Sequence, residues 1–544
     1  MRFRAAFKFF PRPQKKFAGV KITGIISQYA PYNISNGKPT FKEFIMAIEP
    51  VFEKLTVNEK IGETTCQMKV ECKTDVPAES VERILNETAC AVINLGEISD
   101  GRAEINGKAT FFICYLTADG IKKCECGAEI KDALVSDAIS PVDTVNIRWE
   151  TDRVATDLSG LKATVSAYIT VKAEIIKNAE YPVLTGGENV FCDLKSVKTV
   201  KTYGVVSSAA TTEETFDLGY AVEEVISHRA EVCLTAVQCG VGTIICDGEI
   251  YLTEILLQSG EKNDIIRENR VITFRAEIEC EDAMPQFSAT CRAFVKSLKT
   301  DVSVDREKNI SAVTAQVSVG LTGEAFAESE ETFAADAFNT ENQLALVKTR
   351  VNAAVQSAPV CTHKQISGKA AIRDVGAARV ITAANEKIDA LYFTKKDGTL
   401  IVSGALTVNA LFADEDGKPF SVKADVPFET EIPAPDGENI SVSAAIKIAG
   451  VKLITLTEIE CEAEAIFSVY SEKNYATEVI TAVTVGEPKT VQSAAVSVYI
   501  PLAGESLWGL AKRLNVCPET LVATNSDLQF PLTGKERIAV YRQK

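Results

Sequence analysis

Histidine is almost missing from this 544-residue chain, which contains only His228 and His363. General acid–base catalysis and metal binding use histidine often, so a site built on imidazole has few candidates here. His363 follows Cys361 by two positions, but side chains two apart on a strand share a face without necessarily touching. The patterns GxxxxGK[ST], HExxH, GxSxG and a GxGxxG after a strand are also absent. We therefore predict no catalytic residue, no metal site, no cofactor and no enzymatic activity.

Long apolar runs are missing too. No segment approaches the ~20 apolar residues that a membrane-spanning helix needs. The first residues lack the apolar core and cleavage site of a signal peptide. The 15 cysteines are scattered without a repeated CxxC spacing. Cys124 and Cys126 form the closest pair; a tight CxC can bind soft metals, but on an alternating strand both thiols simply share a face. These features predict a cytoplasmic protein with reduced thiols.

Aromatic residues make up only 7% of the chain, while hydrophobic residues reach 46%, so the cores should be mainly aliphatic. The net charge of −16 is uneven: residues 1–45 carry +8, residues 494–544 carry +2, and residues 46–493 carry −26. A body this acidic repels nucleic acid and anionic lipid. We expect no nucleic-acid partner and only indirect membrane contact. Acidic runs such as 328–331 are interpreted as solvated surface rather than as the paired carboxylates of a glycosidase.

Residues 1–45 share no pattern with the rest of the chain. We interpret them as a basic leader that is disordered or not native, with Met46 as the natural start. The alternative is a basic arm that contacts phosphate groups or a membrane.

The body contains a threefold internal repeat. A Gly-x₅-Gly segment is followed each time by an apolar run and a glycine turn, and an Asp lies about 25 residues upstream. The period of about 140 to 156 residues is too long for a solenoid unit and is typical of tandem domains. The three segments are 101–107, 242–248 and 398–404, with turns at Gly120, Gly260 and Gly417 and upstream residues Asp75, Asp217 and Asp374.

Within the repeats the periodicity is that of strands. Ala163–Lys172 and Ser311–Val319 alternate apolar and polar residues, as half-buried antiparallel strands do. We predict a mainly β fold of three tandem β-sandwich-like repeats at residues 46–180, 181–330 and 331–485.

Residues 494–544 show a different pattern, that of a small α+β unit in the order strand, helix, helix, strand. Ser506 suits the N-cap of a first helix, whose apolar residues recur at i, i+3, i+4 and i+7. Pro518 suits the first turn of a second helix, with Leu521 and Val522 on its buried side and Asn525 at its end. Residues 537–541 alternate like a closing strand.

This segment resembles a LysM domain. The matching residues are Gly504–Trp508, Ala511, Lys512, Leu521, Asn525 and the stretch from Gly534 to Val540. Glu505 and Ser506 replace the usual Asp and Thr, and Cys517 stands where a better N-cap residue is usual. LysM domains commonly bind N-acetylglucosamine (GlcNAc) polymers such as peptidoglycan or chitin, and some bind proteins. The resemblance implies a binding site formed by Gly504, Glu505, Ser506, Leu507, Trp508, Lys512, Asn525, Ser526, Asp527 and Leu528.

The repeated body resembles the SPOCS family of spore coat and cortex domains, through the Gly-x₅-Gly segments and the opening segment 55–63. SPOCS repeats followed by one LysM domain are the arrangement of spore-coat morphogenetic proteins of endospore-forming bacteria. The resemblance implies a non-enzymatic scaffold in the mother-cell cytosol, which tethers the coat to the forespore surface through LysM-mediated binding of the coat-basement ATPase. The alternative is a protein of the spore cortex or cell wall that binds peptidoglycan or GlcNAc polymers. A weaker alternative is a polysaccharide-acting enzyme that uses the LysM domain for targeting.

Overall fold

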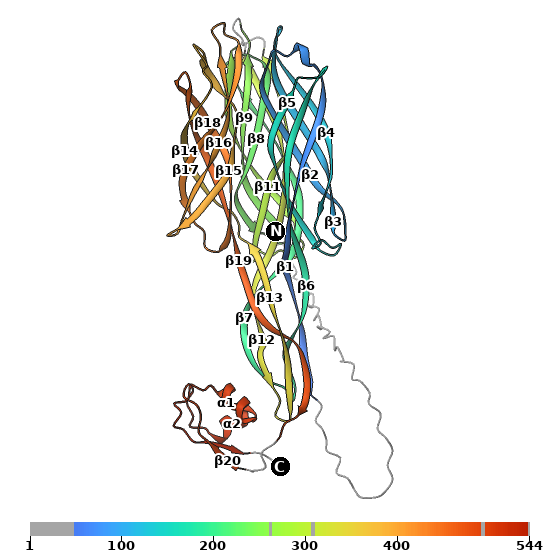
Figure 1. Cartoon of the computed structure of the whole chain (residues 1–544), viewed down its shortest axis with the longest axis vertical. Helices are drawn as coiled ribbons and strands as arrows, with labels where there is room; N and C mark the ends of the chain where they lie inside the picture. The colour runs from blue at the N-terminus through green and yellow to red at the C-terminus, as the bar shows by residue number, and fades with distance from the viewer. Residues whose placement is uncertain (1–47, 261–263, 306–309, 491–495, 542–544) are drawn as a thin grey trace, which may run out of the picture. The chain divides into compact units, whose positions relative to one another are not determined.

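The fold is mainly β, as the sequence predicts (Figure 1). The computed structural model describes residues 48–260, 264–305, 310–490 and 496–541. The predicted leader, residues 1–45, and the predicted start at Met46 lie outside the described residues. The described residues belong to one compact unit that begins at Ile48.

The first third of this unit consists of two three-stranded antiparallel sheets, with strand orders β1-β6-β5 and β2-β3-β4. Buried residues of both sheets, such as Phe111 and Val165, form one mainly aliphatic core. We call this arrangement the first sheet pair. Its strands are β1 (Glu49–Pro77), β2 (Arg83–Ser99), β3 (Arg102–Thr117), β4 (Gly120–Val135), β5 (Thr144–Asp157) and β6 (Lys162–Glu188), with the 3₁₀ turn η1 (Ala78–Ser80) after β1.

The second sheet pair repeats this strand order, with sheets β8-β9-β10 and β11-β12-β7 around a core of its own. Its strands are β7 (Phe191–Asp217), β8 (Val222–Cys239), β9 (Thr243–Gln258), β10 (Ile265–Glu279), β11 (Ser288–Asp305) and β12 (Ile310–Phe338).

The third sheet pair has the sheet β15-β16-β17 and a second sheet in which β19 pairs with β13, β14 and β18. Here the first long strand is split in two, as β13 and β14. The strands are β13 (Asn342–Gln356), β14 (Val360–Ala371), β15 (Arg379–Lys396), β16 (Thr399–Ala413), β17 (Pro419–Pro433), β18 (Glu438–Thr455) and β19 (Glu458–Pro488). The predicted limits at residues 180 and 330 fall inside β6 and β12, because these strands stay paired with β1 and β7 well past the ends of β5 and β11.

The Gly-x₅-Gly segments open the central strands β3, β9 and β16. The first glycine has the same left-handed backbone each time, with φ of +76° at Gly101, +73° at Gly242 and +78° at Gly398. A residue with a Cβ rarely adopts this conformation, so the turn requires glycine. The neighbouring strands β2, β8 and β15 each carry a β-bulge at one equivalent place, where Leu85, Ile226 and Ile381 are the extra residues.

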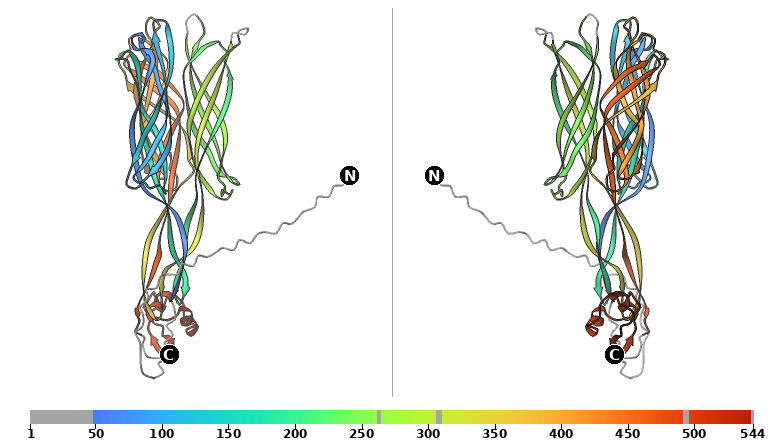
Figure 2. Two further views of the ribbon diagram at one scale, coloured as in Figure 1. Left: turned by 90° about the vertical axis from the view of Figure 1, so that its right-hand side faces the viewer. Right: turned by 90° about the vertical axis from the view of Figure 1, so that its left-hand side faces the viewer.

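These bulges direct side chains out of the sheets into a core that all three sheet pairs share. Cys114, Ile255 and Leu411 occupy equivalent positions in it, thirteen residues after the first glycine of each repeat. A second shared core lies where the paired long strands of the three sheet pairs run together past the shorter strands (Figure 2). It contains Leu55, Val57, Ala179, Val183, Val200, Phe326, Phe333, Val351, Ala353, Val355 and Val479.

The chain ends in what we call the terminal module, residues 496–541. Its elements are β20 (Val496–Tyr499), α1 (Leu507–Leu514), α2 (Pro518–Thr524) and β21 (Ile538–Tyr541), and β20 pairs antiparallel with β21. Leu510, Leu521 and Ile538 are buried in its core. Val522 was predicted on the buried side of the second helix, but it is 44% exposed. The two-turn helix α2 turns only Leu521 fully inward.

Candidate functional site

The terminal module contains all ten predicted site residues, and its first helix starts at the predicted N-cap. The Ser506 hydroxyl accepts a hydrogen bond from the Gly509 N–H at 3.1 Å. This bond satisfies one of the amide groups that the first helical turn leaves open. Gly504, with φ of +80°, makes the turn before the helix. Leu507 is half-buried against the module core.

Glu505 braces this turn. Its carboxylate accepts hydrogen bonds from Arg513 Nε at 2.7 Å and Nη2 at 2.8 Å, and from the Leu502 N–H at 2.9 Å. The hydrogen bond from Arg513 lowers the pKa of Glu505 below its ordinary value. The predicted site residue Glu505 and its partner Arg513 therefore neutralise each other.

Trp508 and Lys512 are bound by the body of the protein. The indole Nε1 donates to Asp336 Oδ2 at 2.9 Å, and Lys512 Nζ donates to both oxygens at 2.7 and 2.6 Å. Asp336 lies near the end of β12, in the second sheet pair. Burial would raise its pKa, but the bonds from Lys512 and Trp508 outweigh burial and hold the pKa below its usual range.

The rest of this contact, which we call the module seat, is both apolar and polar. Phe338 is 3% exposed and packs edge-on against Trp508, with ring centroids 5.1 Å apart. Asn515 accepts a hydrogen bond from Lys489 Nζ at 2.8 Å and donates to the Thr340 carbonyl. The seat thus fixes α1 on the ends of the long strands. Sequence reasoning missed Asp336, because nothing local marks a carboxylate whose partners lie 172 and 176 positions away.

The predicted loop residues divide into two kinds. Asn525 has a structural role. Its Nδ2 donates to the Ala539 carbonyl and its Oδ1 accepts from the Ala539 N–H, both at 2.8 Å. These two hydrogen bonds join the end of α2 to β21. Leu528 is half-buried against the module core. Ser526 and Asp527 are exposed, as is Gly504. Of the predicted site residues, Gly504, Ser526 and Asp527 are therefore exposed, while the aromatic Trp508 is held by the body.

The module has an apolar surface that the prediction did not include. Val496 and Val498 of β20 are 55% and 64% exposed, and Tyr541, paired with Val496, is 56% exposed. Directly paired residues of antiparallel strands point to the same side of a sheet. These three residues therefore lie on the side facing away from the helices, and Ile500, 69% exposed, extends the same alternation. We call these four residues the outer strand face.

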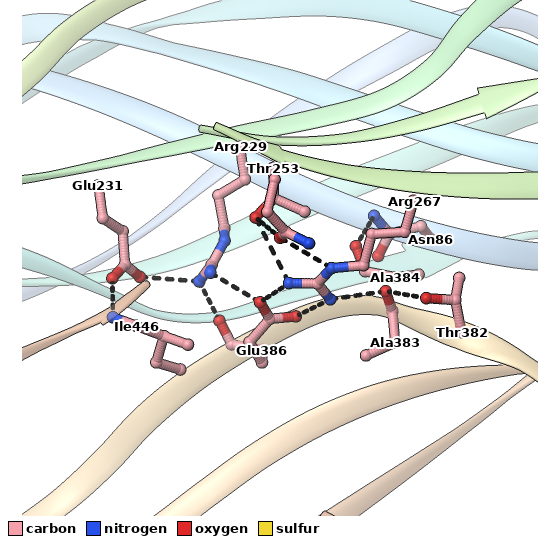
Figure 3. Close-up of polar contacts among 11 residues, drawn as sticks. Asn86, Arg229, Glu231, Thr253, Arg267, Thr382, Ala383, Ala384, Glu386 and Ile446 are labelled. Atoms are coloured by element: carbon pink, nitrogen blue, oxygen red, sulfur yellow. Dashed lines mark hydrogen bonds and ion pairs between the residues drawn. The ribbon is translucent and has the colours of Figure 1, made fainter. Parts of the chain in front are cut away.

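A second polar cluster lies in the body, where the second and third sheet pairs meet (Figure 3). Glu386 of β15 has a fully buried side chain. It accepts from Arg229 Nη2 and from Arg267 Nη1, both at 2.9 Å. Arg229 also donates to Glu231 at 2.7 Å, and the Glu231 carboxylate accepts the Ile446 N–H. We call these two arginines and two glutamates the junction network.

Electrostatics within the junction network favour the charged form of Glu386, whereas burial raises the pKa of Glu231. Burial would raise the pKa of Glu386, but the two arginines outweigh burial and hold that pKa below its ordinary value. Asn86 of the first sheet pair completes the meeting point: it donates to Ser227 at 2.8 Å and accepts from Asn409 at 3.1 Å. Because the charged groups bind one another across the sheet pairs, the arrangement holds the pairs together.

The histidines lie apart. His228 is largely buried, with its Nδ1 2.7 Å from Thr300 Oγ1 and its ring against Phe112. Burial lowers its pKa to about 4, so it is neutral at pH 7. His363 Nδ1 lies 3.4 Å from Glu464 Oε1.

Among the residues that the structure describes, no group of three or more His, Cys, Asp or Glu side chains is placed to hold a metal ion. Within the same residues, no helix combines the length and the apolar character that crossing a bilayer requires.

Comparison with known proteins identifies no relative of this chain: no family model, no curated protein and no solved structure matches it.

Proposed function

We propose that this chain is a non-enzymatic scaffold of spore envelope assembly, which tethers the coat to the forespore surface by protein binding through its terminal module. In this proposal the three sheet pairs are tandem β-sandwich repeats of the SPOCS type, and the module is a LysM domain. The partner is the coat-basement ATPase that the resemblance implies, and the place of action is the mother-cell cytosol.

The observation that carries the proposal is the state of Trp508. A sugar-binding groove needs an accessible aromatic or apolar platform for the faces of its sugar rings. Trp508 instead packs against Phe338, and its N–H donates to Asp336. The exposed apolar surface of the module is the outer strand face, centred on Val498. Exposed apolar residues gathered on one face are typical of protein contacts.

The module seat supports a scaffold role in a second way. Asp336 and Phe338 hold α1 on the body, so the outer strand face is presented from a fixed support. Fixing a binding surface before association reduces the entropy lost on binding.

The experiment measures binding of the full chain to the purified coat-basement ATPase, and cosedimentation of the same chain with peptidoglycan. Val498→Asp places a charge in the outer strand face and should weaken ATPase binding at least ~10-fold, the usual effect of disrupting an interface centre. Thr520→Asp, at an exposed position of α2, is the matched control and should change affinity less than ~2-fold. Equal effects of the two variants, or no ATPase binding by the native chain, would refute the proposal.

A second candidate function, binding of peptidoglycan or GlcNAc polymers, retains support from the exposed Gly504, Ser526 and Asp527. Saturable sedimentation with peptidoglycan that Ser526→Trp abolishes and Val498→Asp leaves intact would establish it in place of the first.

A further inference from the structure

Two thiols lie side by side where the second and third sheet pairs meet. Cys233 of β8 and Cys361 of β14 are 128 positions apart in sequence, yet their Sγ atoms are 3.6 Å apart. Cys233 is 4% exposed and Cys361 is half-buried, and neither is in a disulfide. A disulfide requires the sulfurs to approach to ~2.05 Å, a small further movement for two side chains already in contact.

The surroundings hold both sulfurs in place. The Ser468 hydroxyl lies 3.4 Å from Cys233 Sγ and 3.6 Å from Cys361 Sγ. The thiol of Cys361 donates to the Leu234 carbonyl at 2.9 Å. Tyr251 and Ile466 pack around the pair from the two sheet pairs. The pair therefore lies in a packed interface between two elements rather than in a loop.

The two thiols are not equivalent. The Cys233 thiol donates to the Cys361 sulfur, which lowers the pKa of Cys361 to about 6 and raises that of Cys233; Ser468 and His363 also favour the Cys361 thiolate. The Leu234 carbonyl favours the protonated thiol and partly offsets this effect. Cys361 is also the more exposed of the two. The thiolate is the form that reacts with oxidants, so Cys361 is the sulfur that a small oxidant attacks first.

We propose that Cys233 and Cys361 are a redox modification site, at which peroxide forms a disulfide that locks the second sheet pair to the third. The Cys361 thiolate attacks one peroxide oxygen, the O–O bond breaks, and hydroxide leaves, giving Cys361 sulfenic acid. The Cys233 sulfur then attacks the Cys361 sulfur; the S–S bond forms, the S–O bond breaks, and the departing hydroxide takes the Cys233 proton as water. Two thiols are oxidised by two electrons in total, and one hydrogen peroxide is reduced to two waters. This site lies in the body and does not depend on the function proposed for the terminal module.

The protein contains its own control pair. Cys246 and Cys291 also interact, but inside the core of the second sheet pair, where they are 0% and 1% exposed. Proximity alone predicts that both pairs oxidise equally. Of these two pairs, proximity together with access predicts that only Cys233 and Cys361 react while the protein is folded.

The test treats the folded full chain with hydrogen peroxide, blocks the remaining thiols, digests the protein without reductant and maps the peptides by mass spectrometry. The expected product is a Cys233–Cys361 linked peptide, two hydrogens lighter than its parts, with alkylation of Cys361 slowed at least ~10-fold. In Cys233→Ala, Cys361 should accumulate as a sulfenic acid that dimedone traps. In Cys361→Ser, Cys233 should stay reduced.

A stability measurement accompanies the mapping. Oxidised native protein should unfold at a higher urea concentration than reduced protein, and peroxide should leave the midpoint of Cys361→Ser unchanged. The proposal is overturned if the linked peptide is missing from oxidised folded protein. It is also overturned if Cys246 and Cys291 link at the same rate, or if Cys233 oxidises as fast in Cys361→Ser.

Discussion

Replacing Glu386 by Gln should be among the most damaging single substitutions in the body. The change keeps the size of the side chain and removes its charge. Glu386 is fully buried and binds two arginines, each at 2.9 Å or less. The variant therefore removes one negative charge from the junction network and leaves its arginines without that partner inside the protein. Breaking a buried ion pair by removing one partner costs about 3–5 kcal/mol, because the other charge remains without compensation.

The matched control is Glu462→Gln in β19 of the same sheet pair. Glu462 binds Lys452 at 2.9 Å, but the two side chains are 54% and 62% exposed. An exposed pair of this kind contributes about 0–1 kcal/mol. Both variants replace Glu by Gln. The difference between their losses of unfolding free energy therefore reports the effect of burying the ion pair.

The assay is urea unfolding monitored by circular dichroism. The free energies of unfolding are compared with one common m-value, the slope of free energy against urea concentration. The pKa of Glu386 is lowered in the folded state, so its contribution is present above its unfolded value of 4.5 and is lost as the pH falls through the folded pKa. The difference between native protein and Glu386→Gln should therefore be large at pH 7 and should shrink below pH 4.5. Two outcomes would contradict this reasoning. One is a loss of unfolding free energy in Glu386→Gln no larger than that in Glu462→Gln at pH 7, and the other is a loss that does not change with pH.

Three further predictions follow from other contacts. Asp336→Asn should weaken the module seat and shift tryptophan emission to longer wavelength as Trp508 is exposed, whereas Asp527→Asn should leave the spectrum unchanged. Burial raises the pKa of Glu254 to about 7, so the folded state holds a proton that the unfolded state loses between pH 4.5 and 7, and stability falls over that range. Glu254→Gln should remove this fall, gaining roughly 1–3 kcal/mol relative to native protein at pH 8 and little at pH 4.5, as measured by melting temperature against pH. Ser506→Ala should cost the terminal module about 1 kcal/mol, seen as faster hydrogen exchange in the first turn of α1.

The repeated strands could be predicted because their signals are local. Gly101 and its two equivalents each make a left-handed turn, and a residue with a side chain rarely fits there. In β6, Ala163, Val165, Ala167 and Ile169 are all buried, as their alternation indicates. Helix α1 begins after Ser506 and helix α2 ends at Asn525, as predicted, because helix caps depend on neighbouring backbone groups.

What the sequence did not reveal depends on distant contacts. Val57 and Phe333 give no sign in sequence that the long strands of all three sheet pairs share one core. Trp508 was assigned to ligand binding because its neighbours match a family pattern, while its partner Asp336 lies in another part of the chain. Glu386 carries no local signal either: a glutamate on a strand is ordinarily exposed, and only the approach of two arginines from another sheet pair makes its burial tolerable.

The differences among the repeats explain why one chain needs three similar but unequal units. Thirteen residues after the first glycine, Cys114, Ile255 and Leu411 all enter the shared core, so this position keeps one role in each repeat. Two residues earlier the equivalents diverge: Phe112 packs on His228 of the second sheet pair, and Asn409 donates to Asn86 of the first. Thr253 accepts from Arg267 within its own sheet pair. Identical surfaces would let any sheet pair associate with any other, including one in a second copy of the chain. Unlike polar groups that match only one neighbour remove those alternatives, since a wrong pairing leaves a buried charge or amide without a partner. The contacts of Phe112 and Asn409 therefore favour the observed order of the sheet pairs around their common core.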